Sequence, residues 1–526
     1  MQLSAVTAAV VAALALAYLY RTVSERRRHA ARARELGCQP PPRGFDYEPV
    51  GIVGLLLSAQ ASRRKRFPDY IEERFAELQR REGRYVGTVT LRTPFFRDSL
   101  FTLDPQNIQA ILALKFKDFG LGVNRTENFK PLLGNGIFAT NGKQWEHSRA
   151  LLRPQFVRSQ VSDLELEEKH VRALMTVLEG RLGPGGWTSL VDLQVLFFRL
   201  TLDSATEFLF GESVNSQLGT DVGASPGRDV GFAQAFDRSQ NTLSMGARMG
   251  GNYWLVHTRE FRRMVKAVHD FVDYFVQLAM KQSEAGGDKA AAAGEDKYVF
   301  LRALARETRD PAELRSQLLN ILLAGRDTTA SSLGWFFLTM ADVRYRPVFR
   351  KLRAVVLDQF GTYAAPRDIS FERLKGCQYL QWCIHECLRL YPVVSVNVRT
   401  AQVDTTLPTG GGADGRSPVY VRKGQDVAYS VHVMQRRKDL WGPDAHLFRP
   451  ERWENRRPGW DYLPFNGGPR ICIGQQFALT EIGYVVVRMI QRIDAIDGSS
   501  VGPVTHGLTL TNCPGDGVNV RLHFAE

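Results

Sequence analysis

Residues 465–474 form a glycine- and proline-rich stretch around one cysteine, Cys472, and a helix-like run, Gln475–Glu481, follows at once. The backbone N–H groups of such a loop and the positive end of the following helix favour a thiolate over a thiol. A thiolate in this position could ligate iron. Gly468 and Gly474 could adopt positive φ where the loop turns and let the backbone approach a flat ligand closely. An ordinary turn that buries a free cysteine would also explain a Cys-x-Gly sequence taken alone.

An acid and a hydroxyl, Asp327 and Thr328, lie in the apolar middle of a predicted helix, just after Gly325. The helix is predicted to begin at Asp310, a capping residue followed by proline, and to run to about residue 342. Polar groups in such a place are costly unless they bond to something. Thr328 could donate to the carbonyl four residues earlier and bend the helix. Alternatively, the two side chains could handle protons.

Two further pairs stand at helical spacing. Trp145 and Arg149 are four residues apart and therefore share one helix face. Glu386 and Arg389 are three apart on a helix predicted to end at Tyr391. If the Glu386–Arg389 pair were exposed, it would be worth only about 0.2–0.5 kcal/mol. Packing or a simple cation–π contact would equally explain the tryptophan–arginine pair.

The complete spacing Phe-x-x-Gly-x-Arg-x-Cys-x-Gly, over residues 465–474, resembles the haem-binding loop of the cytochrome P450 superfamily. The resemblance implies haem b as cofactor, with the Cys472 thiolate as the axial ligand of its iron. Arg470 would pair with a haem propionate through charge-assisted hydrogen bonds. The residues that the resemblance places at the cofactor are Trp145, Arg149, Arg399, Phe465, Gly468, Arg470, Cys472 and Gly474.

Residues 324–329, with the sequence Ala-Gly-Arg-Asp-Thr-Thr, resemble the oxygen-activation motif of the same superfamily. The resemblance implies O2 as co-substrate. The Thr328 hydroxyl would hydrogen-bond the oxygen being reduced, and Asp327 would feed protons toward it. The superfamily also has a Glu-x-x-Arg motif and a later arginine that form a buried structural network, which shapes the cysteine loop and is not catalytic. The matching residues here are Glu386, Arg389 and Arg452.

Several short stretches look like the fungal branch of the superfamily that hydroxylates alkanes and fatty acids, among them residues 319–322, 324–329 and 475–481. The resemblance implies a monooxygenase that inserts one oxygen atom of O2 into an unactivated C–H bond, at or near the terminal methyl of a long-chain fatty acid or n-alkane. No positive residue can be assigned to a substrate carboxylate, so acid and alkane stay equally open. The predicted walls of the substrate pocket are Leu322, Leu323, Val393, Val394, Val396, Leu508 and Leu510.

Three other functions stay open from the sequence. A monooxygenase of this kind could act on another hydrophobic secondary metabolite or on a xenobiotic. A haem-thiolate isomerase or dehydratase would rearrange oxidised lipids without O2 or electrons, but the intact Asp327-Thr328 pair argues against it. A non-catalytic haem-binding protein would show no turnover with a reductase.

The chain carries no flavin or nicotinamide fingerprint. The resemblance therefore implies that electrons from NADPH arrive through a separate NADPH–cytochrome P450 reductase, with cytochrome b5 as a further candidate donor. The 526 residues carry a net charge of +13, and residues 21–34 alone hold six arginines and one glutamate. Anionic lipid is the natural partner of that segment, and the sequence shows no basic, aromatic-interleaved patch of the kind that binds nucleic acid.

The elements that must position these residues are mostly helical. The sequence pattern predicts a mainly α fold with a small β region, and the resemblance implies the cytochrome P450 fold over residues 44–526. An amphipathic helix is predicted over residues 67–81, and residues 85–91 and 99–103 alternate as a strand pair. Residues 232–251 are a candidate lid over the hydrophobic small-molecule substrate.

One transmembrane helix is predicted to precede the catalytic domain. Residues 3–20 carry no charge, and 18 residues of helix span about 27 Å, close to the roughly 30 Å of a bilayer core. A cleaved signal peptide would want basic residues before the apolar run, whereas the arginines follow it. The predicted order is a membrane anchor over 1–20, a basic, proline-rich linker over 21–43 and the catalytic domain. Together with six cysteines that lack paired spacing, this predicts a single-pass protein of the endoplasmic reticulum membrane with a cytosolic catalytic domain.

Overall fold

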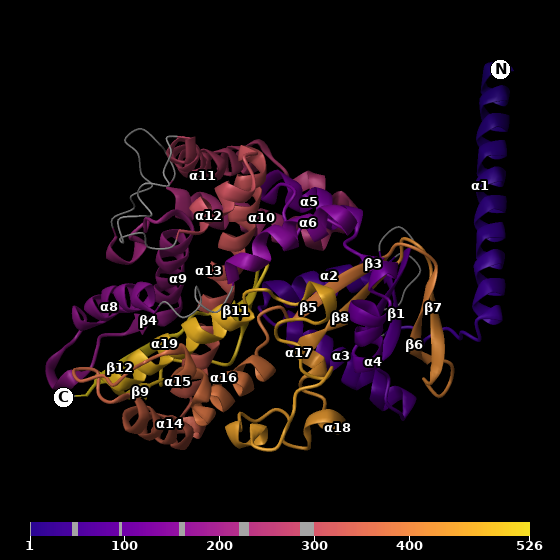
Figure 1. Ribbon diagram of the computed structural model, residues 1–526. Coiled ribbons are helices and arrows are strands. Elements are labelled where there is room, and N and C mark those ends of the chain that lie inside the picture. Colours follow the sequence, from indigo (N-terminus) through magenta and orange to yellow (C-terminus); the bar gives the residue numbers. More distant parts are fainter. Residues whose placement is uncertain are drawn as a thin grey trace. The chain divides into compact units, whose positions relative to one another are not determined.

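The computed structural model describes residues 2–44, 51–93, 97–156, 164–219, 231–284 and 299–525 (Figure 1). The chain divides into two compact units, each discontinuous in sequence. The first unit comprises residues 1–57, 71–120 and 398–429, and the second comprises residues 58–70, 121–397 and 430–526. Helices α2 (Ile52–Arg63) and α3 (Phe67–Glu82) run across the divisions between them.

The first unit holds a five-stranded sheet with the order β1-β2-β8-β5-β3. β1 and β2 pair antiparallel, with Val89 opposite Phe101, while β2 and β8 pair parallel. The predicted strand pair is therefore present, although it begins at Thr88 rather than at residue 85. The elements of this unit are α1 (Gln2–Glu35), β1 (Thr88–Thr93), β2 (Arg97–Thr102), α4 (Pro105–Gln109), β3 (Phe119–Gly120), β5 (Val396–Ala401), β6 (Thr405–Gly411), β7 (Ser417–Val421) and β8 (Asp426–Ser430).

The second unit is mainly helical, so the predicted mainly α fold with a small β region is confirmed. Its helices are α5 (Val123–Leu133), α6 (Gly142–Leu152), α8 (Glu165–Glu179), α9 (Leu193–Phe210), α10 (Phe232–Met249), α11 (Arg259–Glu284), α12 (Phe300–Glu307), α13 (Pro311–Ala341), α14 (Arg346–Phe360), α15 (Phe371–Gly376), α16 (Gln378–Leu390), α17 (Val431–Met434), α18 (Lys438–Trp441) and α19 (Gln475–Arg492). Its strands are β4 (Val191–Asp192), β9 (Ile493–Asp497), β10 (His506–Leu508), β11 (Asn512–Pro514) and β12 (Asn519–Phe524).

Helix α13 is the axis of the second unit, and it packs against α9, α11, α16, α19 and β11 (Figure 1). It begins as the sequence predicts, because the Asp310 carboxylate accepts a hydrogen bond from the Ala312 N–H (2.9 Å) and Pro311 occupies the first turn. The helix ends at Ala341, where the Asp342 carboxylate turns to cap the next short helix. Its 31 residues are long enough to connect two separate parts of the core.

Two hydrophobic clusters lie along α13. The first half of the helix, from Leu314 to Leu323, packs with apolar residues of α5, α10, α11 and α12, and we call this the upper cluster. The second half, from Ala330 to Ala341, packs with residues of α8, α14, α16 and α19, and we call this the lower cluster. The six residues between the two halves, 324–329, are the predicted oxygen-activation motif.

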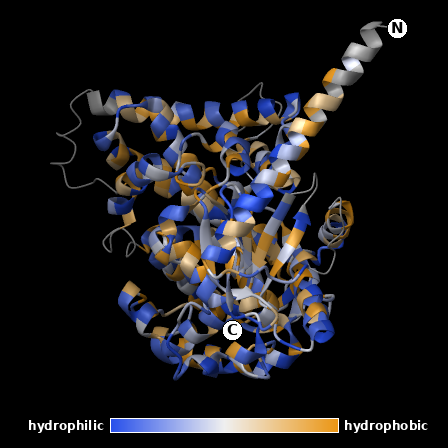
Figure 2. Cartoon of the chain, turned by 90° about the vertical axis from the view of Figure 1, so that its right-hand side faces the viewer, coloured by the Kyte–Doolittle hydropathy of each residue, from blue (hydrophilic) through white to orange (hydrophobic). Residues whose placement is uncertain are grey.

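Helix α1 contains the predicted membrane anchor, and Figure 2 shows its apolar residues giving way to hydrophilic ones toward Glu35. Leu16, Tyr18 and Leu19 are exposed on it. Within the described part of the chain, no helix has the length and apolar character that crossing a membrane requires. The glycine- and alanine-rich stretch over residues 285–298 lies outside the described residues.

Candidate active site

The cysteine loop lies between a single helical turn (Gly468–Arg470) and the start of α19. The Cys472 N–H donates to the Phe465 carbonyl (3.0 Å), which closes the loop. Gly468 has φ +68°, as predicted, but Gly474 has φ −89° and needs no special conformation. The second glycine that the fold requires is Gly467, where a Cβ would lie 2.8 Å from the Trp460 ring. The prediction of a positive φ at Gly474 was wrong because the turn is completed before residue 474, whereas its place at the cofactor stays a prediction.

Cys472 is the exposed cysteine among the six. Desolvation by the surrounding protein raises the pKa of its thiol, whereas the Gly474 N–H and the Arg149 charge act to lower it. Without a bound metal, burial of the thiol thus outweighs the N–H group and the arginine, and the thiolate expected from the loop and helix dipole stays a prediction. A coordinated metal ion would reverse this balance, because a thiol that binds a metal loses its proton.

Arginine side chains surround the loop and are held by backbone carbonyls. The Arg470 guanidinium stacks on the Trp145 ring at 4.4 Å from its centroid and donates to the Thr140 carbonyl (3.0 Å). Arg149 lies 5.8 Å from the same ring and donates to the Ile471 carbonyl (3.0 Å). The structure thus brings together three of the predicted haem-contacting residues around one indole. Burial lowers the pKa of Arg149, and among the residues that the structure describes no carboxylate forms an ion pair with it.

Arg399 is the predicted haem contact that lies in the first unit. It is buried on β5, and its Nη1 donates to the Val398 carbonyl (2.9 Å). Its role at the haem stays a prediction.

Glu386, Arg389 and Arg452 meet in one network, in which Glu386 and Arg389 are fully buried and the Arg452 side chain is 5% exposed. Arg389 forks onto both Glu386 carboxylate oxygens (2.9 and 2.8 Å), and Arg452 Nε reaches one of them (3.3 Å). Arg389 also donates to the carbonyls of Gln435 and Ala445. Sequence reasoning missed Trp453, whose indole N–H donates to Glu386 (3.0 Å). A tryptophan directly after Arg452 was the available signal.

The motif on α13 presents an accessible strip on a helix whose residues are buried on both sides of it, from Ser316 to Leu323 and from Thr329 to Ala341. Ala324, Gly325 and Thr328 are half-buried, whereas their neighbours Leu323 and Arg326 are buried. A Cβ at Gly325 would meet no atom within 4 Å. The Thr328 hydroxyl donates to the Ala324 carbonyl (2.6 Å), so the back-bonding alternative describes its geometry. The helix is continuous through this point.

Asp327 is buried beside Arg326, and both connect α13 to α10. Arg326 donates to Asp327 (3.3 Å) and forms an ion pair with Asp237 on α10. Burial raises the pKa of Asp327 to about 6, although Arg326 and a hydrogen bond from Gln240 oppose that shift. A carboxyl with a pKa near 6 can both release and recover a proton near neutral pH. Neither Asp237 nor Gln240 was predicted, since their approach depends on how α10 packs.

The predicted pocket walls fall into different environments. Leu322 and Leu323 belong to the upper cluster, and Leu510 packs against it from the turn between β10 and β11. Val393 is buried, and its carbonyl accepts from the Asn512 N–H (2.8 Å). Leu508 and Val396 are half-buried, but Val394 is 39% exposed. The structure therefore places Leu322, Leu323 and Leu510 together and leaves Val394 at the surface.

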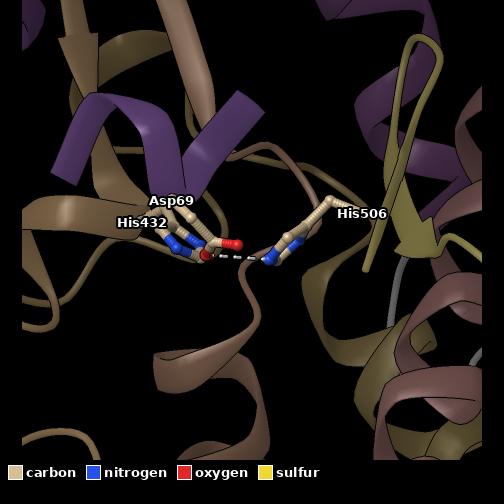
Figure 3. A group of neighbouring side chains, drawn as sticks. All are labelled: Asp69, His432 and His506. Atoms are coloured by element: carbon tan, nitrogen blue, oxygen red, sulfur yellow. Dashed lines mark ion pairs between the residues drawn. The ribbon is translucent and has the colours of Figure 1, made fainter. Parts of the chain in front are cut away.

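A separate cluster of Asp69, His432 and His506 has the composition of a metal site (Figure 3). Asp69 lies 3.4 Å from His506 Nε2, and both histidines are buried. However, an Arg436 guanidinium nitrogen lies 2.9 Å from His432 Nδ1. Because a guanidinium only donates, His432 Nδ1 accepts and its proton resides on Nε2, which cannot then bind a metal. Burial acts to raise the pKa of Asp69, but the hydrogen bond and charge of His506, and then the charge of Arg436, lower it overall. This cluster is therefore a charge-balanced contact between α3, α17 and β10.

The residues at the cysteine loop fit a bound haem. Cys472 and Ile471 are exposed although α19 behind them is buried from Leu479 onward, so an apolar group is expected to cover them. Arg149 and Arg470 supply positive charge beside the loop, and the strip at Gly325 leaves room on α13. Cys472 and α13 belong to the same unit.

Comparisons with known proteins agree with this geometry. The family model for cytochrome P450 matches residues 52–514. A cytochrome P450 monooxygenase from Fusarium sp, g430, is 50% identical over 99% of this chain and 91% of its own length. Cytochrome P450 52A5 from Candida maltosa is 47% identical over 86% of each chain. Cytochrome P450 52E1 from Candida apicola is 45% identical over 89% of this chain and 88% of its own.

Among solved structures, the crystal structure of the cytochrome P450DA heme domain has a similar fold. It superposes with a TM-score of 0.74, covering 93% of this chain and 99% of that one. The two chains share 20% sequence identity, so the likeness concerns the fold alone.

Proposed function

Because the chain belongs to the cytochrome P450 family and is a haem-dependent monooxygenase, we propose that it hydroxylates long-chain fatty acids or n-alkanes at or near the terminal methyl. The observation that carries the proposal is the accessible strip on α13, which directly follows apolar residues of the upper cluster. The likeness to the two Candida proteins supports the predicted fungal branch.

Terminal attack requires geometric selection, because a primary C–H bond is harder to break than the secondary bonds beside it. Holding a reacting atom in place is the means by which proteins obtain such selectivity. Leu322 and Leu323 lie beside the strip on α13, and Leu510 packs against the same cluster. An alkyl chain held by these apolar side chains would present its end to the strip.

The site residues divide the remaining tasks. Bound haem would supply the reduction of O2 and the insertion of one oxygen atom into the C–H bond. Cys472 would hold its iron, while Arg149 and Arg470 would bind its propionates. Asp327 would exchange protons with solvent through its contacts with α10, and the Thr328 hydroxyl would pass a proton at Oγ1. Electrons would come from NADPH through a separate reductase.

The test is product mapping. Purified enzyme, a reductase and NADPH are incubated with fatty acids and alkanes of about 12 to 18 carbons, roughly one bilayer leaflet in length. We expect hydroxylation at or next to the terminal methyl. Hydroxylation scattered along the middle of the chain, or turnover of aromatic or polycyclic compounds alone, would contradict the substrate proposal. The family assignment would not be affected.

Thr328→Ala should uncouple oxygen reduction from hydroxylation. Removing the hydroxyl that relays protons should lower the ratio of product formed to NADPH consumed by up to ~10²-fold. Peroxide should appear as the alternative product, and haem binding should be retained. Thr339→Ala is the matched control, because Thr339 makes the same back-bond to Trp335 (2.8 Å) on the same helix. Equal ratios in both variants would show that Thr328 serves only the helix.

We also propose that residues 1–20 anchor the protein in the endoplasmic reticulum membrane. The support is the uncharged run over residues 3–20 with arginines after it. A second membrane contact is supported by Trp254 and Leu255, which are 60% and 52% exposed in the short helix Gly250–Val256, which begins within the candidate lid.

Deleting residues 1–36 should therefore abolish alkali-resistant membrane insertion but leave an association that detergent disperses. Adding Trp254→Asp and Leu255→Asp should remove that residual binding, since charged groups do not enter the membrane interface readily. Val343→Asp, at another exposed apolar residue (68%), is the control. If the truncated protein does not bind vesicles at low salt, the second membrane contact is contradicted.

A further inference from the structure

We propose that Arg248 binds the substrate carboxylate, so that the preferred substrates are fatty acids and their salts rather than alkanes. This inference rests on the proposed function, because it concerns the far end of the same aliphatic chain. Arg248 lies in the last turn of α10, and sequence reasoning did not single it out.

The position of Arg248 is fixed by the hairpin of β10 and β11. Its Nη2 donates to the Leu508 carbonyl, at the end of β10. Two residues further along, Leu510 packs against the upper cluster that contains Leu322 and Leu323. The hairpin turn thus joins the guanidinium to the apolar residues beside the oxygen-activation motif. An aliphatic chain that contacts this cluster could place a polar head at Arg248.

The charge of Arg248 is not balanced by the protein. Within the part of the chain that the structure describes, no carboxylate forms an ion pair with it. Arg238, ten residues earlier on the same helix, pairs with Glu260 (3.2 Å), and the buried Arg326 pairs with Asp237 and Asp327. Although Arg248 is exposed as a residue, partial burial of its guanidinium lowers its pKa. An incoming anion would relieve that cost.

The guanidinium has capacity for a carboxylate. It carries five N–H donors in a planar fork, and one of them serves the Leu508 carbonyl. A carboxylate can engage two of the remaining donors side by side, the geometry in which arginine binds carboxylates most strongly. An alkane offers no group that could use these donors.

Arg125 on α5 is the alternative cation near the predicted walls. It donates to the Asn397 side chain (3.1 Å), next to Val396, and its guanidinium lies 5.3 Å from the Phe129 ring centroid. Arg125 thus contacts a polar and an aromatic side chain, whereas Arg248 contacts the hairpin whose turn carries Leu510, and for this reason we favour Arg248. The two positions make different predictions for substitution.

The test compares binding of dodecanoate, 1-dodecanol and dodecane to the full-length holoenzyme by haem difference spectroscopy. Arg248→Gln should weaken dodecanoate binding by about 10- to 100-fold, the range for one lost charge-assisted bond, and leave the alcohol and alkane unchanged. Arg248→Lys should restore part of the affinity. Arg238→Gln, which loses a surface pair on the same helix, should leave all three ligands unaffected.

Two results would overturn the inference. Equal weakening of all three ligands by Arg248→Gln would mean that the residue only holds α10 against the hairpin. If Arg125→Gln weakens the binding of dodecanoate alone and Arg248→Gln does not, the carboxylate binds at α5. If the wild-type enzyme oxidises alkanes but does not distinguish acids from them, this inference fails and the proposed function stands. If it accepts no aliphatic chain at all, the proposed function fails with it.

Discussion

Cys472→Ser is expected to abolish turnover and to remove the red-shifted Soret band that a thiolate-bound haem shows when reduced and exposed to CO. The reason is that serine cannot supply the strongly donating thiolate on which that band depends. Among the described residues Cys472 is also the exposed cysteine, and the others are buried or half-buried.

The control is Cys513→Ser. Cys513 lies in β11, donates to the Gly507 carbonyl (3.3 Å), and burial raises its pKa to about 11. This variant should keep the band. If Cys472→Ser protein that contains haem retains the band, the assignment of the iron ligand is wrong.

Glu386→Ala is expected to cost about 3–5 kcal/mol of folding free energy, which is the usual effect of leaving buried charges without their partner. Both carboxylate oxygens are engaged: Arg389 forks onto them, and the Arg452 side chain, the Trp453 indole and the Arg449 N–H add further bonds at 3.0–3.3 Å. Removing the acid leaves the fully buried Arg389 guanidinium without its carboxylate, whereas Arg452 keeps its ion pair with Asp444 (3.1 Å). The loss should appear as a lower midpoint in urea unfolding and as poor haem incorporation.

A matched control exists at the surface. Glu77 and Arg80 on α3 form an ion pair with the same i,i+3 spacing (2.6 Å), but their side chains are 51% and 74% exposed. Glu77→Ala should change stability by no more than about 1 kcal/mol. Similar losses in the two variants would show that burial does not set the value of the Glu386 network. Glu386→Gln keeps the shape of the side chain, so its loss of folding free energy should lie between those of Glu386→Ala and Glu77→Ala and can be measured on folded protein.

The elements that depend on local signals could be predicted from the sequence. The capping aspartate and proline located the start of α13, and the amphipathic pattern over residues 67–81 located α3, on which Ile71, Phe75 and Leu78 are buried. The fixed spacing of the cysteine loop predicted the family. In each case the physical cause lies within a few residues of the chain.

Features that depend on tertiary packing could not be predicted. The pKa of Cys472 is raised because desolvation outweighs the nearby N–H group and arginine, and desolvation cannot be estimated without neighbours. The ion pair between Arg326 and Asp237 joins residues 89 positions apart. Gly474 was expected to need positive φ, yet the close contact with Trp460 occurs at Gly467.

The placement of the motif between two separate apolar clusters on α13 has a consequence for how substrate preference can diverge. Energetic effects of substitutions add independently when the sites share no neighbours. The predicted pocket residues Leu322 and Leu323 belong to the upper cluster, against which Ile473 and Phe477 beside the cysteine also pack, whereas α16 and most of α19 belong to the lower cluster. Substitutions in the upper cluster that do not contact Ile473 or Phe477 should therefore change ligand preference while α16 and most of α19 keep their packing.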